Sequence, residues 1–330
     1  MRDFAYHRAD DAAGAVALVA ADPDARFLGG GTNLVDHLKL GITSPGTLVD
    51  VSRLPLDQVE ELPDGGLRVG TNVRNSDLAA HPAVRRDFPG VARALLAGAS
   101  GQIRHQATTG GNLLQRTRCV YFQDVTTPCN KRDPGSGCSA LEGYGRYNAV
   151  LGLSEACVTT HPSDLAVALA AADATVVVLG PEGERRIPLV DLHRLPGHHP
   201  ERDTVLEHGD LITAVQLPAS AVARNATYRK ARDRASYAFA LVSVAAGLEL
   251  DGEVVRDVRI AWGGVAHKPW RALLAEEALR GAVLTEDAVR EAASAELAAA
   301  TVTAQTAYKV DMVRNLTALA LTRLAEGTGR

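Results

Sequence analysis

The chain has 330 residues, of which 46% are hydrophobic and 22% charged, and its formal net charge at pH 7 is −4. This length allows two or three domains with substantial cores, while the weak negative charge argues against nucleic acid as the main partner. No apolar run approaches the ~20 residues that span a bilayer, and residues 1–7 lack the apolar segment of a secretory signal, so we expect no membrane span and a cytoplasmic protein.

The N-terminal segment predicts a helix over residues 11–21, which Asp10 or Asp11 can cap. A short strand over 25–28 then runs into Gly29-Gly30-Gly31-Thr32-Asn33, and a short helix follows over 34–40. Three consecutive glycines permit positive φ and leave room for a ligand against the backbone. A plain tight turn is the alternative, since the spacing is not that of a Rossmann motif and no Walker lysine follows.

The middle of the chain alternates strands with helices, which indicates an α+β or α/β arrangement. Helical patterns cover 76–100, with interruptions at Pro82 and Pro89, and 164–172, where Ser163 or Asp164 can form the cap. Strand patterns cover 47–51, 66–70, 174–179, 187–192 and 211–217.

The last third of the chain has a different pattern after a linker over 218–225. Strands are predicted over 227–232, 241–250 and 254–263, with Asp251-Gly252 as a hairpin turn, and helices over 270–280, 286–297 and 306–326. This predicts a small antiparallel three-stranded sheet with helices on one face. We place the domain boundary at 220, with domains over 1–220 and 221–330.

All four cysteines of the chain lie within thirty-nine residues, at separations of ten, nine and nineteen positions. They are Cys119, Cys129, Cys138 and Cys157. The contexts of Cys129 and Cys138 are turns rather than apolar runs. A metal or iron–sulfur site is the favoured interpretation, with disulfides and unconnected thiols as alternatives. Zinc usually takes paired Cys-x2–4-Cys ligands, which are absent here.

Four features of the chain occur together: the earlier glycine turn, the segment Gln102-Ile103-Arg104-x-x-Ala107-Thr108-x-Gly110-Gly111-Asn112-Leu113, a later Ser163-Asp164 and the C-terminal module. With these features the chain resembles the FAD-binding subunit of the xanthine dehydrogenase (molybdenum hydroxylase) family. The resemblance covers essentially the whole chain. It implies an α+β fold with a two-subdomain FAD-binding domain of the PCMH type. The subdomains would span about 1–55 and 56–220, and two glycine turns would hold the pyrophosphate.

The resemblance also implies which residues bind FAD. The first turn would comprise Phe27, Leu28, Gly29, Gly30, Gly31, Thr32, Asn33 and Leu34, and the second Thr108, Thr109, Gly110, Gly111 and Asn112. Asp164 matches an acidic residue that contacts the flavin nucleotide, Ile212 an apolar residue packed against the flavin, and Lys230 a basic residue near its ring. As alternatives, Asp164 is a helix cap and Lys230 lies on a solvated strand edge.

The stretch between Leu113 and Ser163 is much longer than in ordinary family members, with an insertion over about 115–160. It looks like the branch represented by the flavoprotein subunit of periplasmic aldehyde oxidoreductase, in which the insertion carries a 4Fe–4S cluster. The resemblance therefore implies that the four cysteines are the ligands of one such cluster. Tyr121, Phe122, Tyr144 and Tyr147 would shield it from water, or else form the loop's own small core.

By this resemblance the chain is the FAD- and 4Fe–4S-carrying subunit of a molybdenum-containing aldehyde oxidoreductase. A large subunit with the molybdenum cofactor and a small subunit with 2Fe–2S clusters would be its partners in a heterotrimer, and an external acceptor would take the electrons. We expect no catalytic side chain of the Ser/His/Asp or paired-carboxylate kind. Two other interpretations are a stand-alone FAD-dependent oxidoreductase and a zinc-stabilised scaffold. The complex is cytoplasmic, or periplasmic if a partner carries the export signal.

Overall fold

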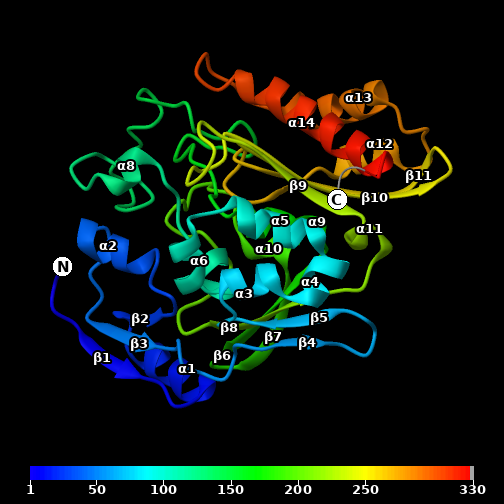
Figure 1. Ribbon diagram of the computed structural model, residues 1–330. Coiled ribbons are helices and arrows are strands. Elements are labelled where there is room, and N and C mark those ends of the chain that lie inside the picture. The colour runs from blue at the N-terminus through cyan, green and yellow to red at the C-terminus, as the bar shows by residue number, and fades with distance from the viewer. Residues whose placement is uncertain (328–330) are drawn as a thin grey trace.

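The computed structural model describes residues 1–327, which form three β-sheets and the helices that cover them (Figure 1). The first two sheets belong to the N-terminal two thirds of the chain, and the third is C-terminal. The predicted α+β fold is thus confirmed. No helix in this part of the chain combines the length and apolar character needed to cross a membrane.

The first sheet is small and parallel, in the order β1-β3-β2, with β1 over Ala5–Arg8, β2 over Ala25–Leu28 and β3 over Thr47–Asp50. Helix α1 (Ala12–Ala21) begins after Asp11, whose carboxylate accepts a hydrogen bond from the Gly14 amide at 2.7 Å. Helix α2 (Leu34–Leu40) follows the first glycine turn. These elements match the sequence prediction, except that it did not include β1.

The second sheet has five strands in the order β4-β5-β8-β6-β7, and each neighbouring pair is antiparallel. The strands are β4 (Val59–Glu61), β5 (Leu67–Gly70), β6 (Thr175–Gly180), β7 (Gly183–Pro188) and β8 (Leu211–Leu217). The strand predicted over 187–192 was wrong in its bounds. The chain forms β7 up to Pro188, and Leu189–Leu192 is then the short helix α10.

Helices α3 (Asn75–Ala80), α4 (Pro82–Asp87), α5 (Pro89–Ala97) and α9 (Asp164–Ala171) contribute buried residues to the same hydrophobic core as this sheet. Pro82 and Pro89 each stand at the first position of a new helix, where the missing N–H costs nothing. The shorter helices are α6 (Gly101–Gln106), α7 (Thr109–Leu113), α8 (Val120–Gln123) and α11 (Ala221–Arg224). Between α7 and α9, α8 is the one regular element in the described chain.

The third sheet is antiparallel, in the order β12-β11-β10-β9, with β9 over Ala226–Ala231, β10 over Val242–Asp251, β11 over Val254–Gly263 and β12 over Trp270–Arg271. The three predicted strands are present, and β12 adds a fourth. The helix predicted from residue 270 therefore begins later, as α12 (Leu273–Leu279), and α13 (Glu286–Glu296), a 3-10 turn (Leu297–Ala299) and α14 (Tyr308–Ala325) follow.

The two faces of the third sheet pack against different partners (Figure 1). Val244, Ala246 and Ile260 belong to the core beneath α12–α14, whereas Ala245 and Ala261 belong to the core shared with α5 and α9. Because successive strand residues point to opposite faces, one strand serves both cores. The C-terminal sheet is therefore sandwiched between its own helices and the N-terminal part of the chain.

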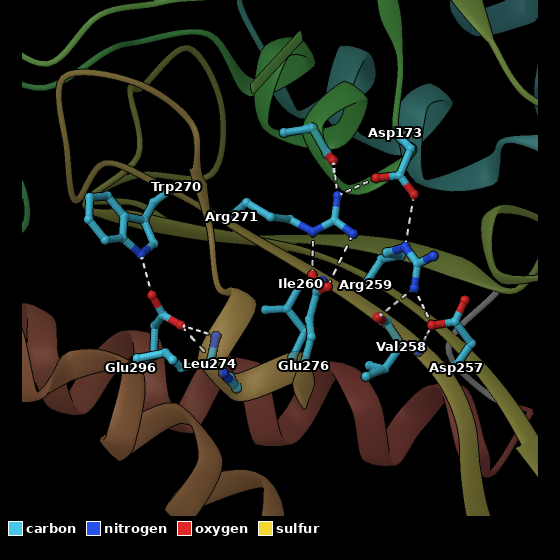
Figure 2. Close-up of polar contacts among 12 residues, drawn as sticks. Asp173, Asp257, Val258, Arg259, Ile260, Trp270, Arg271, Leu274, Glu276 and Glu296 are labelled. Atoms are coloured by element: carbon cyan, nitrogen blue, oxygen red, sulfur yellow. Dashed lines mark hydrogen bonds and ion pairs between the residues drawn. The ribbon is translucent and has the colours of Figure 1, made fainter. Parts of the chain in front are cut away.

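A buried polar network fastens β12 and α12 to the end of α9 (Figure 2). The guanidinium of Arg271 donates to the Ala170 carbonyl and to Asp173, each at 2.6 Å, and is also paired with Glu276. Glu276 is fully buried and accepts the Ile260 amide at 2.8 Å. A buried carboxylate needs this number of donors to offset its desolvation. The network therefore fixes how the two halves of the chain meet.

Candidate functional site

The first glycine turn leaves a row of backbone donors free. It connects β2 to α2, and Gly31 has a φ of 74°, which an L-residue with a side chain rarely adopts. Within the described chain, the amides of residues 29–33 donate to no protein acceptor. Successive free amides in a turn form a concave anion site. The turn thus suits a pyrophosphate group such as that of FAD.

The second glycine turn is built differently, because the protein uses its donors internally. The Gly110 amide donates to the Thr71 carbonyl at 3.0 Å, and the Thr109 hydroxyl donates to the Val73 carbonyl at 3.0 Å. The Thr108 hydroxyl caps α7 by accepting the Gly111 amide at 3.2 Å. This turn is consequently fixed to the segment after β5. Of the two turns predicted to bind phosphate, the first is the one whose backbone amides are free to donate to it.

The two turns are in direct contact. The Gln106 side-chain amide donates to the Gly30 carbonyl at 3.2 Å, and a Cβ at Gly30 would lie under 3.0 Å from the Gln106 carbonyl oxygen. A Cβ at Gly29 would lie 3.3 Å from the Thr108 hydroxyl. The two segments predicted from the sequence, 27–34 and 108–112, therefore form one continuous surface whose close approach depends on glycine.

Ile212 lies beneath this surface, on β8. It is 2% exposed, and its Cγ2 would be 3.7 Å from a Cβ at Gly110. It is therefore placed to support the second turn from the core. Its contact with a flavin ring stays a prediction.

Asp164 and Lys230 form a buried ion pair between α9 and β9. The Lys230 ammonium lies 2.7 Å from one Asp164 oxygen, and the Tyr228 hydroxyl donates to the other at 2.5 Å. The Lys230 side chain is only 3% exposed, so the alternative of a solvated strand edge was wrong. Ser163, not Asp164, caps α9 by accepting the Ala166 amide at 3.0 Å. A contact of either Asp164 or Lys230 with the flavin stays a prediction.

The long segment between the second turn and α9 returns to its starting point. The Ser163 hydroxyl donates to the Asn112 side-chain oxygen at 2.6 Å, so both ends of the insertion meet beside the second turn. Inside the insertion, Cys129 and Cys138 pair as an antiparallel bridge, closing a hairpin. The Asn130 side-chain amide donates to the Ala156 carbonyl at 3.0 Å, which draws the Cys157 segment onto that hairpin.

All four cysteines line one pocket. Its other lining residues are Thr117, Tyr121, Phe122, Pro128, Lys131, Ser139, Ala140 and Thr159. The Thr117 and Thr159 hydroxyls are hydrogen-bonded to each other, which brings the Cys119 and Cys157 segments together. All four cysteines are free thiols, which excludes the disulfide alternative in this structure.

The surroundings of Cys138 favour the thiolate form of its side chain. The Cys157 thiol donates to it, and the amides of Ala140 and Val158 add further hydrogen bonds, so its pKa falls to about 6 although burial opposes this. Burial raises the pKa of Cys119. No group of three or more His, Cys, Asp or Glu side chains among residues 1–327 is arranged to hold a single metal ion. A 4Fe–4S cluster takes one thiolate on each of its irons, so its ligands surround the cluster rather than converge on one ion.

Of the four aromatic residues predicted to shield the cluster, two lie at the cysteine pocket, and the shielding itself stays a prediction. Tyr121 and Phe122 line the pocket, and Phe122 is 1% exposed. Tyr144 and Tyr147 do not line it and have exposed rings. The Tyr147 hydroxyl donates to Asp233 at 2.6 Å, which explains its outward position. The two outer tyrosines therefore contribute to the surface of the insertion.

Three charged residues that the sequence did not single out connect the pocket to the first turn. Asp203 pairs with Arg116 and with Lys131, each at 2.5 Å. The Arg116 amide donates to the Asn33 side chain at 3.0 Å. Burial opposes ionisation of Asp203, but the two cations outweigh it and hold its pKa well below the usual range. A lysine two positions after a predicted ligand was the one available signal.

Three histidines lie next to these charges, of which His193 and His267 are buried and His161 is partly buried. The rings of His161 and His193 are 4.2 Å apart, and His193 shares a hydrogen bond of 2.8 Å with the Leu113 carbonyl. Burial lowers the pKa of His193 to about 4 and that of His267 to about 3. At neutral pH these imidazoles are therefore uncharged.

Comparisons with known proteins show the family of the chain. The family profile described as "FAD binding domain in molybdopterin dehydrogenase" matches residues 2–220, and the one described as "CO dehydrogenase flavoprotein C-terminal domain" matches residues 226–324. The chain is 55% identical over 280 residues to the aldehyde oxidoreductase FAD-binding subunit PaoB of Escherichia coli (strain K12), which covers 84% of this chain and 86% of the relative.

More distant relatives also match over most of the chain. The glyceraldehyde dehydrogenase medium chain of Sulfolobus acidocaldarius is 26% identical over 292 residues, covering 88% of this chain and 86% of the relative. Among solved structures, carbon monoxide dehydrogenase from Hydrogenophaga pseudoflava superposes with a TM-score of 0.77 at 25% identity and covers 98% of both chains. Quinoline 2-oxidoreductase from Pseudomonas putida 86 gives a TM-score of 0.76 at 22% identity, covering 100% and 99%. This last likeness concerns the fold alone.

Proposed function

The chain belongs to the molybdenum hydroxylase family as one of its FAD-binding subunits, and we propose that it is the FAD- and 4Fe–4S-carrying electron-transfer subunit of an aldehyde oxidoreductase of the xanthine dehydrogenase type. In this proposal a large subunit with the molybdenum cofactor oxidises the aldehyde. A small subunit with 2Fe–2S clusters relays the electrons. This chain passes them to an external acceptor.

The observation that carries the proposal is the convergence of the cysteines. Four thiols that lie ten, nine and nineteen positions apart line a single pocket, although the segment between them contains little regular structure. Backbone amides of Tyr121 and Phe122 donate to the Cys119 sulfur. Amide hydrogen bonds to cysteine sulfurs are among the features that tune iron–sulfur centres. The donor set therefore fits a 4Fe–4S cluster.

The part of this chain in FAD binding follows from the two turns. The free amides of residues 29–33 would hold the pyrophosphate, and the second turn would support them from the protein side. FAD accepts and releases electrons singly or in pairs, so it can take single electrons from the relay and pass them to an acceptor. The buried Lys230 ammonium, held by Asp164, is the cation proposed to lie near the ring.

The subunit interpretation is favoured over the two alternatives. A stand-alone flavin oxidoreductase needs its own substrate-binding domain, whereas the chain beyond residue 226 is accounted for by a flavoprotein C-terminal domain. A zinc scaffold needs four thiolates converging on one ion, and in the described chain they do not. The free amides of the first glycine turn would also have no purpose in that scaffold.

The test is metal and flavin analysis of the complex co-purified with its partner subunits. Cys129→Ser, compared with wild type, should lower the iron content by about four atoms per chain, since a cluster that loses a ligand is lost. The control Thr126→Ala changes an exposed residue in the same insertion that does not line the pocket. Unchanged iron in Cys129→Ser, or zinc bound in stoichiometric amount, would reject the cluster.

The same variant separates electron transfer from a purely structural cluster. If electrons pass through the cluster, Cys129→Ser should slow acceptor reduction by the assembled complex while the large subunit still oxidises aldehyde with an artificial acceptor. Full acceptor reduction without the cluster would leave the cluster a structural part of the insertion. Flavin content is measured in parallel, so that loss of FAD is not mistaken for loss of the relay.

A further inference from the structure

Lys131 places a buried positive charge on the wall of the cysteine pocket. It lies two residues after Cys129, and its side chain is only 1% exposed. Its ammonium donates to the Pro200 carbonyl at 2.6 Å and to Asp203 at 2.5 Å. Desolvating an ammonium costs several kcal/mol unless partners compensate it. The Pro200 carbonyl and Asp203 supply that compensation, so the chain holds a buried charge in a fixed place at the pocket.

The net charge around Lys131 is positive. Asp203 is its only ionic partner among the described residues, and Asp203 is shared with the Arg116 guanidinium. Lys131 lines the pocket, whereas Asp203 and Arg116 do not. The nearby His161, His193 and His267 have pKa values lowered by burial and are neutral at pH 7. The sulfurs consequently face one cation that its carboxylate neutralises only in part.

The field of Lys131 acts on the cysteines. Lys131 and all four cysteines line the same pocket, so its positive charge attracts negative charge on the sulfurs. The same attraction favours any added negative charge in the pocket. Reduction of an iron–sulfur cluster adds one electron, with no bond formed or broken, so a neighbouring cation raises the reduction potential.

We propose that Lys131 sets the reduction potential of the cysteine-held cluster, and that Asp203 is the residue that positions it. This inference rests on the proposed function, because it requires the cluster. Asp203 also connects Lys131, through Arg116, to Asn33 in the first glycine turn. One chain of contacts thus holds the tuning charge in a fixed place relative to both the cysteine pocket and the FAD turn.

The experiment is an EPR-monitored redox titration of the complex with its partner subunits. Lys131→Gln removes the charge and keeps a donor for the Pro200 carbonyl, and Lys131→Met removes the charge and keeps the length of the side chain. Both should shift the cluster potential to more negative values with iron and flavin contents unchanged. Lys131→Arg should restore the wild-type potential, because it restores the charge.

The control is Arg146→Gln, which removes a more exposed cation in the same insertion, paired with Asp233. Solvent screens that charge, so the potential should stay unchanged. Wild-type potentials in both Lys131→Gln and Lys131→Met would overturn the proposal. Loss of iron in both, with iron retained in Lys131→Arg, would also overturn it, since Lys131 would then hold the pocket together. A wild-type complex without the cluster signal would instead refute the proposed function.

Discussion

A single methyl group at Gly30 should separate the two glycine turns and weaken FAD binding. The added Cβ would lie under 3.0 Å from the Gln106 carbonyl oxygen and 3.2 Å from the Ala107 Cα. Both atoms belong to the backbone, so neither can rotate away, and the turns must move apart. Overpacking of this kind costs about 1–3 kcal/mol. If that cost falls on the FAD-bound arrangement, the Kd for FAD rises about tenfold to a hundredfold.

The matched control is Gly101→Ala, which makes the same chemical change at the start of α6, where a Cβ has nothing within 4 Å. The assay is the flavin-to-protein ratio of the purified complex after dilution and gel filtration, together with a fluorescence titration for the Kd. Gly101→Ala should bind FAD like wild type. A wild-type Kd in Gly30→Ala, or an equal loss in both variants, would refute the account of the two turns.

Three further predictions concern stability. His193 and His267 have pKa values of about 4 and about 3 when folded, against 6.5 when unfolded, so the unfolded state binds protons first as the pH falls. Each of the two histidines should therefore lower the free energy of unfolding by about 2 kcal/mol between pH 6.5 and 5, which a lower midpoint of urea unfolding would show. Equal midpoints at pH 7 and 5 would contradict this. Burial lowers the pKa of Lys309 to about 7, so stability should rise from pH 7 to 9 by about 1.4 kcal/mol per unit, and Lys309→Met should abolish that rise in the same titration. Glu276→Gln should destabilise the chain by about 3 kcal/mol, because it removes the buried one of the two carboxylates that pair with Arg271 and leaves only the half-exposed Asp173 to compensate that charge. An unchanged thermal midpoint would show that the network of Figure 2 does not fasten the two halves of the chain.

Local sequence patterns predicted most of the fold, because the apolar runs and the turn residues that flank them indicate the same element boundaries. β2, β8, β11 and α2 have the predicted bounds, and each is bounded by glycine, proline, asparagine or acidic residues. The errors lie where tertiary pairing decides. β7 is an edge strand with a mostly exposed, polar sequence, so the apolar Leu189–Leu192 looked like the strand although it is a helical turn. Pairing with β11 likewise makes Trp270–Arg271 a strand.

The candidate site was predictable where the backbone itself contains the signal. Glycine turns and clustered cysteines can be recognised in the sequence itself. In the structure the two turns form one surface, and the four cysteines line one pocket. The charges between them were not predictable, because Arg116, Lys131 and Asp203 come from segments up to 87 residues apart and have no characteristic spacing. Lys230 shows the same limit: a lysine on an edge strand reads as solvated until a buried carboxylate is found opposite it.

The insertion also contributes to the fold independently of its cysteines, which determines how its function can be tested. Val150 and Leu151 are fully buried in the C-terminal core, and both amides donate to the Val265 carbonyl, at 2.8 and 3.0 Å. At its other end, Arg116 contacts the first glycine turn. Deleting the insertion would therefore remove core residues and a contact with the first glycine turn together with the proposed cluster, and a loss of electron transfer would have three explanations. Cys129→Ser leaves both attachments in place, so a loss of acceptor reduction with flavin retained can be assigned to the cluster.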